Sequence, residues 1–249
     1  MAESFSHFAE FYDEFMVKLV DYPAWVEYVI SIWDFFNIKP KIVLDLACGT
    51  GIPSIILLKK GYQVIGVDKS SAMLKIFRKK IAENETLKSK LLLIESDITN
   101  FTLDILVDAC VSFYDSINYL LTEEDLEKCF SLVHKFLKKG GIFTFDMNTI
   151  FVLEKFWGNN TFVRESENLK TVWENRFDKK LNISTLYLKC YPKNNQGFFL
   201  EVHKERGYEY KTIIKILKKA GFQKVKLFHH LTFLPAKKNS LRIMVVALK

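Results

Sequence analysis

The 249-residue chain is poor in cysteine, proline and glycine, with 4, 5 and 10 of these residues. Its four cysteines, Cys48, Cys110, Cys129 and Cys190, are scattered, and none forms a CxxC pair or stands beside a histidine ligand pattern. This spacing predicts no zinc or other metal site and no disulfide framework. It is typical of a protein that is kept in the reducing cytoplasm.

Long apolar runs are also missing. No stretch approaches the roughly 18 consecutive apolar residues that can cross a bilayer. The start of the chain, MAESFSHFAEFYDEF, mixes acidic with aromatic side chains, unlike a secretion signal, which pairs a basic end with an apolar run. We therefore expect a cytoplasmic protein without a membrane partner.

Charge is not spread evenly. The formal net charge is +7, and residues 207–249 alone carry ten basic side chains and one acidic one. A basic tail can indicate nucleic acid binding. Lys215, Lys218 and Lys219, however, fall on the expected wet face of a helix, which favours a solvated surface. Nucleic acid is a partner that the sequence leaves open but does not favour.

The period of the apolar residues divides the chain. Spacings of three and four predict two helices within residues 8–36, broken near residues 21–23. From residue 39 to residue 150, apolar strand patterns alternate with helical ones, which predicts a parallel sheet covered on both faces and hence a doubly wound α/β domain. One of these helices, TEEDLEKCFSLVHKFLKKGG, is expected to start after Thr122 and to stop at Gly140.

Residues 151–206 interrupt this rhythm. They alternate apolar with polar residues around turn sequences, which predicts antiparallel hairpins. We expect three parts: N-terminal helices in 1–38, an α/β domain in 39–150 and 207–249, and a β-rich insertion in 151–206. The insertion leaves the carboxyl end of the fifth strand, where ligands bind in such folds, so it is placed to act as a lid that determines the substrate and not the cofactor. Its aromatic residues could wall a pocket: Trp157, Phe162, Trp173, Phe177, Tyr187, Tyr191, Phe198 and Phe199.

The sharpest motif is the stretch VLDLACGTG between the first α/β strand and its helix. The small residues Ala47, Gly49 and Gly51 let a ligand approach the backbone closely, and the helix start behind them offers free N–H groups. Asp45 ends a buried strand, where a carboxylate is costly unless a polar partner or a ligand meets it.

Two more acids end the next strands. Asp68 ends the second strand, where a carboxylate can accept hydrogen bonds from both hydroxyls of a ribose. Asp97 ends the third strand and could accept one from the amine of adenine. Because the carboxyl ends of parallel strands share one edge of a sheet, these acids are expected to line one crevice.

Together these motifs resemble those of class I S-adenosylmethionine-dependent methyltransferases of the small-molecule type. DLACGTG resembles the glycine-rich first motif, GVD the ribose-binding acid and SDI the adenine-contacting acid. VDACVSFYDSINYL resembles the fourth-strand segment beside the methyl donor, and KKGGIFTFDMN the fifth strand. The resemblance covers roughly residues 39 to 150, and Ala47 stands where the commonest pattern has its first glycine.

The resemblance implies a Rossmann-like seven-stranded sheet of order 3-2-1-4-5-7-6, in which only the seventh strand is antiparallel. It implies S-adenosyl-L-methionine as the cofactor, with N-terminal helices that cap it through Tyr12 and Trp25. The full set of cofactor-binding residues that it predicts is Tyr12, Trp25, Asp45, Ala47, Gly49, Gly51, Asp68, Lys69, Met73, Ser96, Asp97, Ile98 and Ser112.

The implied activity is in-line methyl transfer to a nitrogen, oxygen or sulfur nucleophile of a small molecule, by a monomer or homodimer. Candidates for a catalytic base, needed only if the nucleophile arrives protonated, are Tyr114 and Asp115 after the fourth strand and His203 at the exit of the insertion.

Three alternatives stay open. The first is methyl transfer to RNA or protein, and the second is a non-catalytic sensor that binds adenosylmethionine. The third is an NAD-dependent oxidoreductase, since Gly49-x-Gly51-x-x-Ser54 is a degraded GxGxxG pattern. Asp45 argues against the third, because a dinucleotide fingerprint keeps its strand apolar up to the first glycine.

Overall fold

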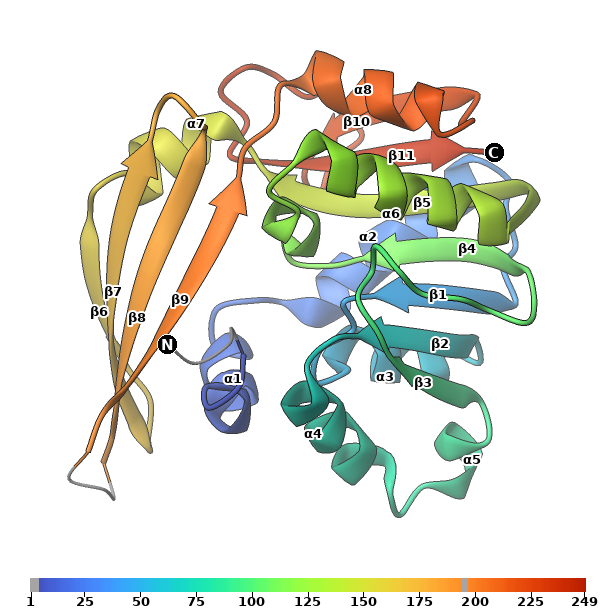
Figure 1. Cartoon of the computed structure of the whole chain (residues 1–249). Coiled ribbons are helices and arrows are strands. Elements are labelled where there is room, and N and C mark those ends of the chain that lie inside the picture. The colour runs from blue at the N-terminus through green and yellow to red at the C-terminus, as the bar shows by residue number, and fades with distance from the viewer. Residues whose placement is uncertain (1–4, 194–196) are drawn as a thin grey trace.

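Seven strands form the central sheet of the computed structural model, which describes residues 5–193 and 197–249 (Figure 1). The sheet order is β10-β11-β5-β4-β1-β2-β3. Only β11 runs antiparallel to its neighbours, and it pairs with both β5 and β10. The predicted order 3-2-1-4-5-7-6 is therefore confirmed. The strands are β1 (Ile42–Leu46), β2 (Gln63–Asp68), β3 (Leu91–Glu95), β4 (Val107–Ser112), β5 (Leu137–Asn148), β10 (Lys224–His229) and β11 (Arg242–Leu248).

Helices cover both faces of this sheet. Apolar side chains of α6 and α8 pack on one face and those of α2 and α3 on the other, while α4 packs near β2 and β3. These buried faces are what the three-and-four spacing predicted. The bounds are α2 (Tyr22–Phe35), α3 (Ile52–Lys59), α4 (Ser71–Ile81), α5 (Glu85–Lys88), α6 (Glu123–Phe136) and α8 (Tyr210–Lys219). None of the helices within residues 5–193 and 197–249 is long and apolar enough to cross a membrane.

Helix α6 begins as predicted and ends earlier than predicted. The Thr122 side chain caps its start by accepting a hydrogen bond from the Asp125 N–H. The helix stops at Phe136, because Leu137 is already buried in strand β5, opposite Val107. Gly140 has a φ of +77° and turns the chain within the irregular start of that strand, rather than ending the helix.

A second sheet of four antiparallel strands follows β5, in the order β6-β7-β8-β9. It consists of β6 (Thr161–Glu165), β7 (Leu169–Asp178), β8 (Ile183–Pro192) and β9 (Phe199–Arg206). The antiparallel insertion after the fifth strand is thus confirmed, with β6 as an edge strand that the sequence pattern did not predict. The short turns α7 (Ile150–Val152) and η2 (Leu153–Trp157) connect β5 to this sheet.

The first helix, α1 (Ala9–Met16), lies between the two sheets (Figure 1). Phe8 and Phe15 pack with Leu169 and Leu188 of the four-stranded sheet. On its other side, Asp13 accepts a hydrogen bond from Thr50 of the glycine-rich loop and pairs with Lys80 of α4, at 2.6 Å. Helix α1 therefore joins the insertion to the carboxyl edge of the large sheet.

A candidate methyl-transfer site between two sheets

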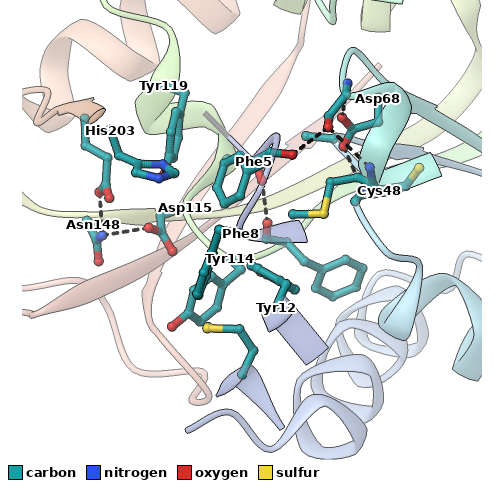
Figure 2. Close-up of a pocket in the computed structure, with 18 of the residues that line it drawn as sticks. Phe5, Phe8, Tyr12, Cys48, Asp68, Tyr114, Asp115, Tyr119, Asn148 and His203 are labelled. Atoms are coloured by element: carbon teal, nitrogen blue, oxygen red, sulfur yellow. Dashed lines mark hydrogen bonds between the residues drawn. The ribbon is translucent and has the colours of Figure 1, made fainter. Parts of the chain in front are cut away.

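A cavity of about 460 Å³ opens at the carboxyl edge of the seven-stranded sheet. Its walls come from the loops after β1, β2, β3 and β4, from the start of the chain and from the four-stranded sheet. Figure 2 shows Asp68 and Cys48 on one side, His203 and Asn148 on the other, and Phe5 between them. Of the eight aromatic residues of the insertion that were expected to wall a pocket, Trp157 and Trp173 line the cavity and the other six do not.

The glycine-rich loop lines one end of this cavity. Ala47, Gly49 and Gly51 all have positive φ angles, of +55°, +54° and +79°. A Cβ at Gly49 would meet no protein atom within 4 Å, whereas one at Gly51 would overlap the ring of Phe77. Gly51 is therefore required by packing, and Gly49 leaves open space at the cavity wall.

Asp45 is 1% exposed and accepts a 2.6 Å hydrogen bond from the Ser54 hydroxyl. Burial raises the pKa of this carboxyl to about 7, despite the Ser54 hydrogen bond, and the charge of Asp68 adds to the rise. Asp68 accepts hydrogen bonds from the N–H groups of Gly49 and Ser70, both at 2.8 Å. Each Asp68 oxygen keeps a lone pair for a ligand hydroxyl.

The remaining predicted cofactor residues divide into two groups. Tyr12, Lys69, Met73, Asp97 and Ile98 line the cavity together with the loop and the two acids. Trp25, Ser96 and Ser112 lie outside the cavity wall. The structure gives them supporting contacts: Trp25 packs on Tyr114, the Ser96 hydroxyl donates to the Asn100 carbonyl, and the Ser112 hydroxyl donates to the Leu46 carbonyl.

The turn after β4 holds two of the three predicted catalytic candidates. Tyr114 and Asp115 have φ angles of +58° and +53°, a conformation that costs energy for residues other than glycine. Fully buried Asp146 of β5 holds the turn by accepting from both backbone N–H groups, at 2.6 and 2.9 Å. Arg242 of β11 donates to Asp146 and, at 2.7 Å, to Asp115.

His203, the third candidate, belongs to β9 and lines the cavity from the insertion. It is 3% exposed, its Nδ1 lies 3.1 Å from the Tyr119 hydroxyl, and its Nε2 lies 3.2 Å from Glu201. Burial opposes ionisation of Glu201, but the contact with His203 and the hydrogen bonds from the N–H groups of Phe8 and Phe5 lower its pKa. The structure thus brings His203 to the same cavity as Tyr114 and Asp115.

The segment that leads into α1, residues 5–8, crosses the cavity; we call it the strap. Glu201 accepts hydrogen bonds from its N–H groups at Phe5, His7 and Phe8, at 2.8 to 2.9 Å. The Phe5 carbonyl accepts a 3.0 Å hydrogen bond from Ser70, next to the glycine-rich loop. The Phe5 ring packs 4.7 Å from the His203 ring (Figure 2). The strap is therefore tied to both walls of the cavity.

Sequence reasoning missed Asp146, Asn148, Glu205 and Arg242, which share one polar network at the cavity. A role for Asp146 and Asn148 could have been predicted in part, because polar residues at the end of the buried strand GIFTFDMN need hydrogen-bond partners. Arg242 and Glu205 carried no such signal. Each belongs to a strand. The alternation of apolar and polar residues in a strand predicts the face on which a side chain lies, but not which other residues pack against that face.

Comparison with known proteins agrees with this arrangement. Residues 43–141 match the model of a methyltransferase domain. The Bacillus subtilis protein YqeM is 31% identical over 221 residues, which cover 87% of this chain and 85% of that protein. The dTDP-3-amino-3,4,6-trideoxy-alpha-D-glucopyranose N,N-dimethyltransferase of Streptomyces venezuelae is 27% identical over 155 residues, 62% of this chain and 59% of that protein.

Among solved structures, a crystal structure of an S-adenosylmethionine-dependent methyltransferase from Clostridium acetobutylicum superposes with a TM-score of 0.86. It is 30% identical, and the match covers 97% of both chains. The likeness therefore includes the N-terminal helices and the insertion as well as the α/β domain. The chain belongs to the family of S-adenosylmethionine-dependent methyltransferases.

Proposed function

We propose that this protein transfers a methyl group from S-adenosylmethionine to a small organic molecule held between the two sheets. The observation that carries the proposal is that one cavity joins the glycine-rich loop and Asp68 at one end to Asp115 and His203 at the other. Cofactor and substrate would meet there, walled from water by the strap and the insertion sheet, which favours alignment of the reacting groups.

The residues at the first end fit the cofactor. The open space at Gly49 suits a ligand that lies against the backbone, Asp68 keeps acceptor capacity for ribose hydroxyls, and Asp45 is a buried acid that a cationic amino group would compensate. When bound, the cofactor supplies an electrophilic methyl group whose carbon–sulfur electron pair returns to sulfur. The role of the chain is to position the two reactants and to exclude water.

A small molecule is a better candidate than RNA for the substrate of this protein. The exposed lysines of α8 lie on a helix that covers one face of the large sheet, and Lys219 pairs with Glu127 of α6 at 2.8 Å (Figure 1). The aminosugar dimethyltransferase named above acts, by its name, on a small molecule, which supports the same class here.

Calorimetry with S-adenosylhomocysteine, S-adenosylmethionine and NAD tests the cofactor first, and we expect the first two to bind and NAD not to bind. A turnover screen of small amines, alcohols and thiols beside RNA and protein, followed by release of S-adenosylhomocysteine, then tests the substrate class. Cofactor binding without turnover on any of these would favour the sensor alternative, and turnover on RNA or protein alone would replace the small-molecule proposal.

A further inference from the structure

Two carboxyl groups from different parts of the chain meet in the cavity. Asp115 follows β4, and Glu205 comes from β9 of the insertion; both line the cavity. The side-chain amide of Asn148 joins them, with its Nδ2 3.0 Å from Asp115 Oδ2 and 2.7 Å from Glu205 Oε2 (Figure 2). The pair is therefore assembled only when the insertion sheet sits at the edge of the large sheet.

Fewer positive than negative charges surround this pair. Arg242 is bound by Asp115 and by Asp146, so one cation serves two acids before Glu205 is counted. Of the other basic residues that line the cavity, Arg164 lies over the Trp173 ring, 4.8 Å from its centroid, and Lys69 follows Asp68. Within the described ranges, no ion pair joins a lysine or arginine to Glu205.

The shortage of positive charge favours a protonated form of the Asp115–Glu205 pair. Burial raises the pKa of Glu205 to about 8, and the charge of Asp115 adds to the rise against the Asn148 hydrogen bond and the charge of Arg242. Burial also raises the pKa of Asp115, although Arg242 opposes it. Two facing carboxyls titrate as a unit. The titratable and charged groups around Glu205 are Asp115, Tyr119, Asp146, His203 and Arg242.

A second observation at the same place is a buried hydroxyl with spare hydrogen-bonding capacity. Tyr22 lines the cavity and is 4% exposed, and apart from the neighbouring Tyr12 hydroxyl its own hydroxyl meets no polar partner among the described residues. Tyr12, Tyr114 and Tyr119 line the cavity as well. Burial is the first cause that raises the pKa of each of these four tyrosines, so all are neutral phenols. The Tyr114 ring already has the Arg242 guanidinium over it, 5.1 Å from its centroid, which shows the attraction of aromatic rings for a cation in this wall.

We propose that this end of the cavity receives the ammonium group of an aliphatic amine, held by Asp115 and Glu205, and that Glu205 determines this choice of substrate. The inference rests on the proposed function and narrows its substrate class. A neutral alcohol or thiol would leave the carboxyl pair without its missing cation. The cofactor does not supply that cation at this place, because Asp45 and Asp68, which fit its amino group and its ribose, come from β1 and β2 at the other end of the cavity.

Proton accounting in this site is simple. The substrate enters as an ammonium ion, and the proton shared by Asp115 and Glu205 leaves to solvent. The bound ammonium then gives one proton to Glu205, and the nitrogen lone pair that this frees forms the new bond to carbon. The methylated amine leaves as a cation, and the carboxyl pair again holds one proton. One proton is released per methyl group transferred, at the binding step.

The test uses protein saturated with S-adenosylhomocysteine and three matched pairs of probes: propylamine with propanol, cyclohexylamine with cyclohexanol, and glucosamine with glucose. Calorimetry in two buffers of different ionisation enthalpy measures affinity and proton release together. We expect at least one amine to bind about 10-fold or more tightly than its alcohol, with release of a proton, because a charge-assisted contact replaces a neutral one. Affinity should rise with pH through about 8, where Glu205 loses its proton.

Glu205→Gln should abolish both the amine preference and the proton release and leave the affinity for S-adenosylhomocysteine within a few-fold. Asp115→Asn is the second variant if the first does not fold. Glu209→Gln is the matched control, since Glu209 is exposed and lies outside the cavity wall.

Absence of an amine preference in all three pairs, or a preference that survives both Glu205→Gln and Asp115→Asn, would overturn the inference. Failure of the wild-type protein to bind S-adenosylhomocysteine would instead overturn the proposed function, so the two failures are distinguishable.

Discussion

Fold stability and cofactor binding place opposite requirements on the charge of Asp45. Its carboxyl is buried, and its pKa is raised to about 7 by that burial, so its ionised form destabilises the unliganded fold. A raised carboxyl pKa means that the contribution of the group to stability is complete at acid pH and is lost as pH rises towards 7. The charge that costs stability is the one that would attract a cofactor amino group.

Asp45→Asn should therefore separate stability from binding. We expect the variant to gain thermal stability relative to the wild type as pH rises from 5 to 8, and to bind S-adenosylhomocysteine roughly 10-fold to 100-fold more weakly, because a charged acceptor becomes neutral. Melting curves at four pH values and calorimetry measure the two effects. Asp104→Asn, an exposed loop position, should change neither; a parallel pH response of Asp45→Asn and wild type would contradict this account.

Asp68 makes a different prediction, because it holds the backbone as well as facing the cavity. Asp68→Ala should weaken S-adenosylhomocysteine binding by roughly 30-fold to 1000-fold, and it should also lower the free energy of unfolding by about 1–3 kcal/mol, since it leaves the N–H groups of Gly49 and Ser70 without their acceptor. Denaturant unfolding beside calorimetry tests both parts, and unchanged binding in a folded variant would make Asp68 a purely structural acid.

Among the elements, the strap and β9 are joined by one side chain. Glu201 is fully buried and accepts from three strap N–H groups at the start of α1, where a helix leaves unpaired donors. Glu201→Ala should release residues 5–8 and fray α1. We expect faster amide hydrogen exchange over residues 5–16 and, since Phe5 and Tyr12 line the cavity, several-fold weaker binding of S-adenosylhomocysteine. Lys204→Ala, an exposed position in the same strand, is the control; equal exchange rates in both variants would argue against the tie.

The elements differ in how far the sequence predicts them. The central sheet was predictable because most of its strands are apolar runs between clear helix signals, as in β1 (Ile42–Leu46) and β2 (Gln63–Asp68). The glycine-rich loop and its acids were predictable because their chemistry is local. The Asp115–Asn148–Glu205 network was not, because it joins residues 33 and 57 positions apart through a packing of two sheets that no local pattern encodes. The strap was missed for the same reason.

At the scale of the whole molecule, the cavity lies between the seven-stranded and the four-stranded sheet, and α1 contacts both. Replacing residues 151–206 by a short Gly/Ser linker should therefore do more than remove a substrate wall. Phe8 and Phe15 would lose their partners in the four-stranded sheet, and Glu201 would no longer hold the strap. We expect S-adenosylhomocysteine binding to weaken by about 10-fold or more, with loss of exchange protection in α1, as contacts of several kcal/mol disappear. Cofactor affinity within a few-fold of the wild type would show instead that the insertion acts on the substrate alone.

The strap also has a practical consequence for how this protein is handled. Phe5 lies in the cavity wall, whereas Lys249 lies at the opposite edge of the sheet, where its carbonyl accepts from the Gly140 N–H (Figure 1). We expect an N-terminal tag to weaken S-adenosylhomocysteine binding and a C-terminal tag not to, and calorimetry on the two tagged forms compares them directly. Assays that immobilise or label the protein at its first residues would report on the tether as much as on the enzyme.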